Sequence, residues 1–131
     1  MPNDRKSEAD ALRVVLVDDD VTFLGALRDG LAAAGRIAVV ACAHDVDTGV
    51  DAIERHSPHV AVVDGHMPGG GGTELTRRLR RGGHRTAVVV LSAHDDGRST
   101  QLALESGADA FVAKGGRLDE LIDLVARLAR R

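Results

Sequence analysis

The sequence contains no tryptophan, no tyrosine and only two phenylalanines among its 131 residues. Sites that hold bases or flavin rings rely on stacking against aromatic side chains, so this scarcity disfavours both kinds of site. The chain also has a single cysteine, Cys42, which excludes an internal disulfide. Because Cys42 lies within the apolar stretch IAVVACA, we expect it to pack as a small buried hydrophobe.

Long apolar runs and a strong charge imbalance are absent as well. No run approaches the ~18 apolar residues that would cross a bilayer. The opening MPNDRKSEAD is polar and mixed in charge, unlike a signal peptide. A net charge of -3 does not fit a strongly basic nucleic-acid binder. We therefore expect a cytoplasmic protein without membrane contact, with a flexible tail over residues 1–10 and one domain over residues 11–131.

Five short apolar runs, rich in β-branched residues, alternate with segments of helical spacing. Nearly continuous apolar runs of this kind are typical of parallel strands covered on both faces. Glycine or proline closes the first four helical segments, as helix C-termini prefer. The pattern predicts an α/β fold of the (βα)5 type, a doubly wound parallel five-stranded sheet of flavodoxin-like order 2-1-3-4-5. The predicted strands are LRVVLV (12–17), IAVVACA (37–43), HVAVVD (59–64), TAVVVLS (86–92) and DAFVAK (109–114).

Polar side chains stand where four of these strands end. Ligands of open α/β sheets gather at the carboxyl ends of the strands, where the strand order reverses. The order 2-1-3-4-5 makes the first and third strands neighbours, which brings the first acidic pair beside the acid that ends the third strand. The strand-end residues are Asp18 and Asp19, Asp64, Ser92 and Lys114.

Three carboxylates this close cannot all stay ionised unless a cation joins them. Mg²⁺ suits the position because it takes hard oxygen ligands and keeps waters at its other positions. The chain has fifteen arginines and only two lysines, Lys6 and Lys114, so a lysine at a strand end indicates that a compact point charge is needed there. The set predicts a phosphoryl-transfer site with a carboxylate acceptor, although one of Asp18 to Asp20 is expected to serve only as a helix N-cap.

Over residues 12 to 130 the sequence resembles the CheY-like receiver domain of two-component response regulators, most closely that of the LuxR/NarL-type class. VVLVDDD is similar to the first strand with its acidic pair, and VVDGHMPGGGG to the strand with the acceptor aspartate and its Met-Pro step. VVVLSA supplies a serine beside a small residue, and GADAFVAK supplies an aromatic residue and the lysine. All four pieces occur in the family's order and spacing.

The resemblance implies that Asp64 attacks the phosphohistidine of a sensor histidine kinase and becomes an aspartyl phosphate. Asp18, Asp19, Asp64 and the backbone carbonyl of His66 would hold Mg²⁺, with Asp18 acting largely through a coordinated water. The chain would then be a phospho-acceptor and not an enzyme acting on a separate substrate, although such domains can catalyse their own phosphorylation and dephosphorylation.

The remaining implied roles belong to the switch. Ser92 would bond a phosphoryl oxygen and move inward, Phe111 would change rotamer to fill the space, and Lys114 would pair with the phosphoryl group. The output would be a shift between two packings of the face formed by the fourth helix, the fifth strand and the fifth helix. Phe111 stands where tyrosine is usual, so its switching would rest on packing alone.

The resemblance leaves the output open. Gly115 and Gly116 follow the lysine where many receivers have proline, and a non-proline there is frequent in the LuxR-type class. That class continues into a DNA-binding domain that this chain does not contain. The chain is thus expected to control transcription through such a domain, and DNA only through it, or to act as a stand-alone receiver. Homodimerisation on phosphorylation is a further expectation from the family.

His66 and His94 follow the acceptor and Ser92 by two residues each, at positions that flank the site mouth in the family. We hypothesise that these imidazoles make dephosphorylation depend on pH near neutrality, against the alternative that they are two exposed loop histidines. The remaining histidines are expected at the surface.

A haloacid-dehalogenase-like phosphatase is the alternative function. It would read VVLVDDDVT as its nucleophile motif, with Asp18 as nucleophile and Asp20 as acid/base. That assignment leaves Asp64 without a role and lacks a later acidic pair for magnesium. A flavodoxin-like binding module is also less consistent, because three aspartates would repel a phosphate in the absence of metal.

Four glycines, residues 69–72, follow the Met-Pro step. Gly72 matches a common receiver glycine and is expected at a turn with positive φ. Gly70 and Gly71 replace side chains that pin this loop in relatives, so the loop is expected to be mobile until Mg²⁺ and a phosphoryl group bind.

Overall fold

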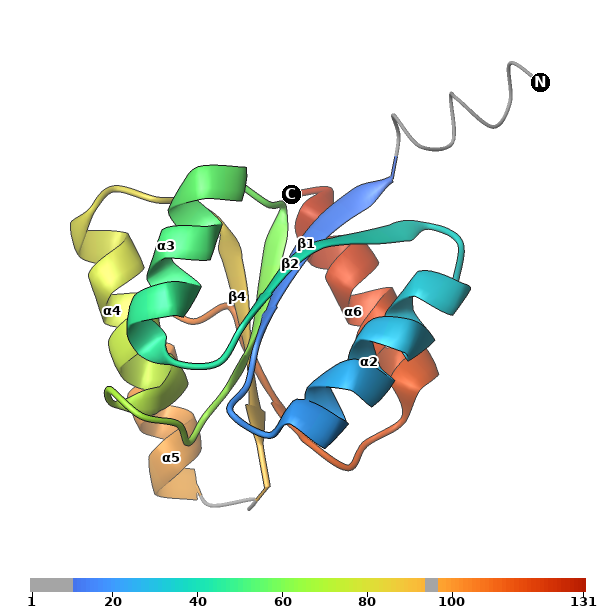
Figure 1. Ribbon diagram of the computed structural model, residues 1–131. Coiled ribbons are helices and arrows are strands. Elements are labelled where there is room, and N and C mark those ends of the chain that lie inside the picture. The colour runs from blue at the N-terminus through green and yellow to red at the C-terminus, as the bar shows by residue number, and fades with distance from the viewer. Residues whose placement is uncertain (1–10, 94–96) are drawn as a thin grey trace.

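A computed structural model describes residues 11–93 and 97–131 of the chain. Over these residues strands and helices alternate, and the helix labels begin at α2 (Figure 1). The elements are β1 (Leu12–Val17), α2 (Val21–Ala33), β2 (Ile37–Ala43), α3 (Val46–His56), β3 (Val60–Asp64), α4 (Gly71–Arg81), β4 (Ala87–Ser92), α5 (Gly97–Glu105), β5 (Ala110–Ala113) and α6 (Leu118–Ala129).

The strands form one sheet in the order β2-β1-β3-β4-β5, and every neighbouring pair is parallel. The predicted (βα)5 fold and strand order are therefore confirmed. Because all strands run in the same direction, their carboxyl ends meet at one edge of the sheet. Two of the three inner strands, β3 and β4, are buried along their whole length, which explains their continuous apolar sequences.

Two hydrophobic clusters lie on opposite faces of the sheet. Successive residues of β1 alternate between them: Val14 and Leu16 join one cluster, and Val15 and Val17 join the other. Helices α2 and α6 cover the first face, and α3, α4 and α5 cover the second (Figure 1). Each fully buried valine or leucine contributes about 1.5–3 kcal/mol, so this double layer holds the strand ends in fixed positions.

Two leucines of helix α5 do not face the hydrophobic core. Leu102 and Leu104 mark the segment in the sequence, yet both side chains are exposed, and Ala103 between them is buried. The helix therefore packs through a small residue and presents two leucines to solvent.

The glycine run corrects one prediction. Positive φ angles occur at Gly69 (97°), Gly70 (111°) and Gly71 (69°), whereas Gly72 has none. Gly72 is required for space instead, because a Cβ there would lie 3.1 Å from the Asp64 carbonyl oxygen and 3.2 Å from the methyl groups of Val90. Gly71 is more constrained still, since a Cβ would lie 2.0 Å from the carbonyl oxygen of Gly65.

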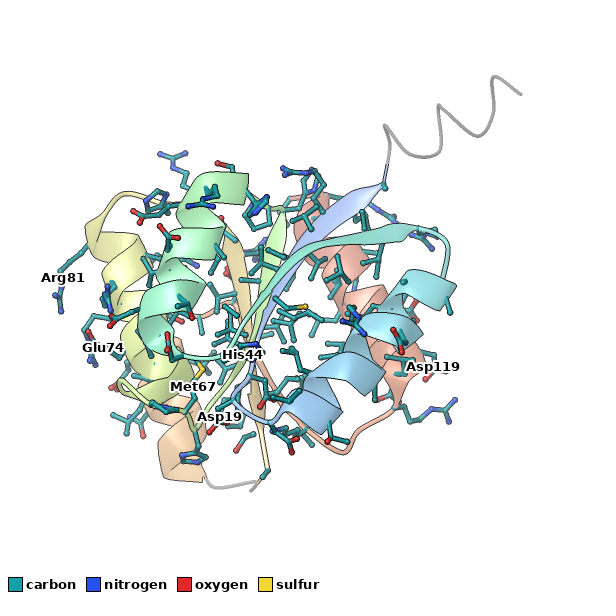
Figure 2. All side chains as sticks on the ribbon, in the orientation of Figure 1. Asp19, His44, Met67, Glu74, Arg81 and Asp119 are labelled. Atoms are coloured by element: carbon teal, nitrogen blue, oxygen red, sulfur yellow. The ribbon has the colours of Figure 1, made fainter. Side chains whose placement is uncertain are left out.

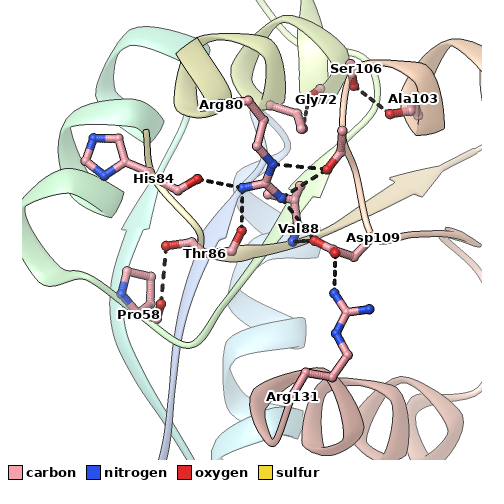
Figure 3. Close-up of polar contacts among 12 residues, drawn as sticks. Pro58, Gly72, Arg80, His84, Thr86, Val88, Ala103, Ser106, Asp109 and Arg131 are labelled. Carbon is pink, nitrogen blue, oxygen red and sulfur yellow. Dashed lines mark hydrogen bonds and ion pairs between the residues drawn. The ribbon is translucent and has the colours of Figure 1, made fainter. Parts of the chain in front are cut away.

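At the amino end of the sheet, Arg80 of α4 joins the starts of β4 and β5 (Figure 3). Its guanidinium donates to the carbonyl oxygens of His84 and Thr86, twice to that of Gly107, and to the carboxylate of Asp109, at 2.8 to 3.1 Å. Asp109 also accepts from the backbone N–H of Val88 at 2.8 Å and pairs with Arg131 at the end of the chain. All five donors of the guanidinium are used.

In the described parts of the chain, no helix is both long and apolar enough to span a bilayer. The predicted flexible tail, residues 1–10, lies outside the described residues.

Candidate functional site

The carboxyl ends of β1, β3, β4 and β5 bring the predicted strand-end residues together. Val17 is in register with Val63, so Asp18 and Asp64, the next residue on each chain segment, are neighbours across the β1–β3 pair. Lys114 follows β5, and its backbone N–H donates to the carbonyl oxygen of Ser92 at 2.7 Å. Figure 2 labels Asp19 at this edge of the sheet.

Three carboxylates form the centre of the site. One oxygen each of Asp18, Asp19 and Asp64 lies within 4.8 Å of the others. Asp18 and Asp64 are buried, at 2% and 5% exposure, and Asp19 is exposed. Asp64 Oδ1 accepts a hydrogen bond from the backbone N–H of His66 at 3.2 Å, which fixes the orientation of the carboxylate.

Asp20, the third member of the acidic run, has a local task. Its backbone N–H donates to Asp18 Oδ1 at 2.8 Å, and its own carboxylate accepts from the backbone N–H of Phe23 at 3.1 Å. Asp20 is thus the N-cap of α2, as expected for one of the three aspartates. This contact offers no support for an acid/base role of Asp20, which the phosphatase alternative requires.

Lys114 supplies the positive charge of the site. Its Nζ lies 2.9 Å from Asp18 Oδ2 and 3.5 Å from Asp64 Oδ2. Burial acts to lower the pKa of Lys114, but the hydrogen bonds and charges of the two carboxylates outweigh burial and raise it above its ordinary value. The lysine is therefore an ammonium shared between two acids.

The pKa of Asp64 is shifted in the opposite direction to the shift that a salt bridge alone would produce. Burial, together with the nearby charge of Asp18, raises the pKa of Asp64, while the His66 N–H and Lys114 only partly offset this. One ammonium between two buried carboxylates, with Asp19 beside them, does not neutralise the cluster. The site consequently keeps an excess of negative charge that a further cation would relieve.

The donor set fits a hard divalent cation. Asp18 Oδ2 is fully buried and, apart from its ion pair with Lys114, accepts no hydrogen bond from the described residues. A buried carboxylate oxygen without a directed hydrogen bond, next to two more carboxylates, is the oxygen-only set that Mg²⁺ prefers. The share of the His66 backbone carbonyl in such a site stays a prediction.

The two predicted switch residues lie on neighbouring strands. Ser92 is buried at the end of β4, in register with Ala113. Phe111 is half-buried, in register with Val90, and packs against the cluster under α3, α4 and α5. The structure therefore places Ser92 at the carboxylate edge and Phe111 further back in the sheet, on the strand that leads to Lys114.

Of the two histidines in the pH hypothesis, the structure describes only one. His66 is exposed beside Asp64, whereas His94 lies outside the described residues. His44, expected at the surface, is exposed, but its Nδ1 lies 3.4 Å from the carbonyl oxygen of Asp18. The dependence of dephosphorylation on these imidazoles stays a prediction.

Phe23 is a contact that the sequence did not reveal. The centroid of its ring lies 4.5 Å from Lys114 Nζ, within the range of a cation–π interaction. The only available signal was its rarity, since it is one of two aromatic residues and follows the acidic run by about one helical turn. Phe23 and Lys114 both line a hollow of about 650 Å³ between α2, β5 and α6.

Comparisons with known proteins agree with this geometry. A family model described as the response regulator receiver domain matches residues 14–126. The probable transcriptional regulatory protein NarL of Mycobacterium tuberculosis is 31% identical over 123 residues, or 94% of this chain and 57% of that protein. The response regulator MprA of Mycobacterium bovis is 34% identical over 121 residues, or 92% of this chain and 52% of that protein. The chain spans about half the length of these relatives.

Solved structures give the same result. The signal receiver domain of the putative response regulator NarL from Mycobacterium tuberculosis superposes with a TM-score of 0.89 at 31% identity, covering 92% of this chain and 98% of that one. A LuxR-family two-component response regulator from Aurantimonas has a TM-score of 0.85 at 30% identity, covering 92% of this chain and 87% of that one.

Proposed function

The chain belongs to the response regulator receiver domain family, and from that premise we propose that it accepts a phosphoryl group on Asp64 within a two-component signalling system. The observation that carries the proposal is the setting of Asp64. It is buried, oriented by the His66 N–H, and has an ammonium 3.5 Å from its second oxygen. A carboxylate held in this way meets the requirements of a nucleophile for phosphoryl transfer.

In the proposed reaction a carboxylate oxygen of Asp64 forms a bond to phosphorus, and the bond between phosphorus and the donor breaks. Receiver domains of this family are phosphorylated by sensor histidine kinases, so the physiological donor is a phosphohistidine, whose imidazole nitrogen keeps the bonding electrons and takes a proton. Lys114, which lies between Asp18 and Asp64, would pair with the phosphoryl oxygens, and the hydroxyl of the buried Ser92 would donate to one of them.

Asp18, Asp19 and Asp64, with the His66 carbonyl, would hold Mg²⁺. The ion would supply positive charge that reduces repulsion between the carboxylates and the incoming phosphoryl group. The chain's own contribution is to keep three oxygens within 4.8 Å of one another on the ends of two adjacent strands and the start of a helix.

The output is proposed to run through α5, β5 and α6. Ser92 and Phe111 lie on adjacent strands that lead to this face, so an inward movement of one side chain and a rotamer change of the other would alter its packing. NarL is named as a probable transcriptional regulatory protein, which supports an output in transcription through a DNA-binding domain outside this chain. A stand-alone receiver, and homodimerisation on phosphorylation, are the accompanying proposals, with residues 11–131 as the receiver domain.

Acetyl phosphate with Mg²⁺ provides the test. The parent protein should gain one phosphoryl group by mass spectrometry, and Asp64→Asn should gain none. Asp29→Asn, an exposed aspartate on α2 away from the site, serves as a matched control and should label like the parent. Labelling that persists in Asp64→Asn but disappears in Asp18→Asn would contradict the proposal and assign the nucleophile to Asp18, as in the phosphatase alternative.

A further inference from the structure

The Lys114 ammonium has a third partner that the proposed reaction does not use. Besides its contacts with Asp18 at 2.9 Å and Asp64 at 3.5 Å, Nζ lies 4.5 Å from the centroid of the Phe23 ring. A lysine ammonium carries three N–H donors. Two carboxylates and one ring face give it three partners, so its position is determined from three directions.

We propose that Phe23 is a positioning residue for phosphoryl transfer: its ring face holds the Lys114 ammonium beside Asp64, ready to pair with the phosphoryl group. The inference rests on the proposed function, and it assigns a part to a side chain on α2, the helix that Asp20 caps. Because Asp20 accepts from the backbone N–H of Phe23, the acidic run and the ring are fixed by the same helix start.

The ring differs from the other two partners in what a metal ion would do to it. Asp18 Oδ2, which makes the 2.9 Å contact with the lysine, is also the buried oxygen that suits a cation. A cation bound there would weaken the attraction of Asp18 for Lys114. A neutral ring attracts an ammonium through its quadrupole and is not an oxygen ligand of Mg²⁺, so its hold on the lysine persists.

The surroundings of the lysine make such a hold necessary. Lys114 lines the hollow of about 650 Å³ together with Phe23, Leu121 and Leu124, and none of the three carboxylates is among its lining residues. Together with Asp64, the half-buried ring of Phe23 keeps the ammonium near the acids when a cation weakens the attraction of Asp18. Without the ring, the long and flexible side chain has open space into which it can turn.

The experiment uses the fact that the chain has only two lysines. Selective ¹³C labelling of lysine gives two Cε signals, and that of Lys114 is identified as the one missing from Lys114→Arg. In the parent, the ring current of Phe23 should shift the Lys114 Cε protons away from the values of Lys6. Phe23→Leu should remove this shift and slow phosphorylation by acetyl phosphate about two- to fivefold, the size of a cation–π contact at a half-exposed site.

Phe23→Tyr keeps the ring face and should restore both the shift and the rate. Leu124→Ala is the matched control, because it truncates another wall of the same hollow without touching the ammonium. It should lower the free energy of unfolding but leave the Lys114 signal and the phosphorylation rate unchanged. A Lys114 signal with no ring-current shift in the parent, or parent-like rates in Phe23→Leu, would overturn the inference.

The two proposals fail in distinguishable ways. If the parent is not phosphorylated on Asp64, the proposed function is wrong, and the ring-current shift still shows whether Phe23 holds Lys114. If the parent is phosphorylated normally but the shift is absent, the function stands and the role of Phe23 does not.

Discussion

The charged groups at the two ends of the β-sheet differ in how completely they are paired. At the amino end, Arg80 uses every N–H of its guanidinium on carbonyl oxygens and on Asp109, so the positive group is fully satisfied (Figure 3). At the carboxyl end, two of the three clustered carboxylates, Asp18 and Asp64, share the ammonium of Lys114, and a buried oxygen of Asp18 has no partner other than this ammonium among the described residues.

The difference separates stability from function. A guanidinium with five hydrogen bonds joins α4 to the starts of β4 and β5 and leaves nothing for a ligand to satisfy. A cluster of buried like charges lowers stability, and it persists because the two hydrophobic layers hold the strand ends in place. The unsatisfied end of the sheet is therefore the end where a cation and a phosphoryl group would be bound.

The largest effect on stability is expected from replacing Arg80 at the amino end of the sheet. Arg80→Met removes one of the two positively charged partners of Asp109 and leaves three carbonyl oxygens without the donors that Arg80 supplies. The substitution should therefore lower the free energy of unfolding by about 3 kcal/mol. Urea denaturation measures the loss. Arg81→Met is the matched control, because Arg81 is the exposed neighbour on the same helix. Equal effects of the two substitutions would show that the amino end is no more important than ordinary surface.

Mg²⁺ should stabilise the protein through the carboxylates at the carboxyl end of the sheet alone. At a tenfold excess over its Kd, Mg²⁺ should raise the free energy of unfolding of the parent by about 1.4 kcal/mol through mass action. Asp18→Asn should lose most of this gain, whereas Arg80→Met should keep it, since the two ends share no contacting residues. Denaturation with and without Mg²⁺ tests both. A gain in Asp18→Asn as large as in the parent would place the cation elsewhere.

A smaller effect, opposite in sign to that of Arg80→Met, is expected from Asp64→Asn in metal-free buffer. Burial raises the pKa of Asp64 above its unfolded value, so folding disfavours the charged form at neutral pH. Removing the charge should therefore stabilise the protein at the expense of phosphorylation. The gain should shrink as the pH falls through the raised pKa toward the ordinary carboxyl value, because the parent carboxyl then becomes protonated. A destabilised Asp64→Asn at pH 7 would mean that the Lys114 contact outweighs burial.

The sequence predicted the fold and the carboxylate cluster because both follow from burial. Short apolar runs rich in β-branched residues are typical of strands covered on both faces, and parallel strands place their carboxyl ends together. Once the order β2-β1-β3-β4-β5 is known, Asp18 and Asp64 must be neighbours. Nothing in this reasoning needs the direction of a single side chain.

Features that depend on side-chain direction or on close contact were not predicted. Phe23 reaches Lys114 from a helix that is far from it in the sequence, and Arg80 finds its acceptors in two loops, before β4 and before β5, that only the folded chain brings together. Gly72 was expected to be needed for its φ angle, but its importance comes from the nearby Asp64 carbonyl. Contacts of this kind are set by the packing of elements and not by periodicity.

The weakest effect is expected in the glycine loop, where Gly70 and Gly71 differ in burial and hydrogen bonding. The backbone N–H of Gly71 donates to the carbonyl oxygen of Met67 at 3.2 Å, and Gly71 is buried. Gly70 is exposed, and its N–H has no hydrogen bond among the described residues. Amide hydrogen exchange should therefore be fast at Gly70 and slower at Gly71 in metal-free protein. Only Gly70 should gain marked protection when Mg²⁺ and a phosphoryl group order the carboxyl end. Exchange at Gly70 that is the same in both states would show that this loop takes no part in the site, and the contrast between the two ends would then rest on the carboxylates alone.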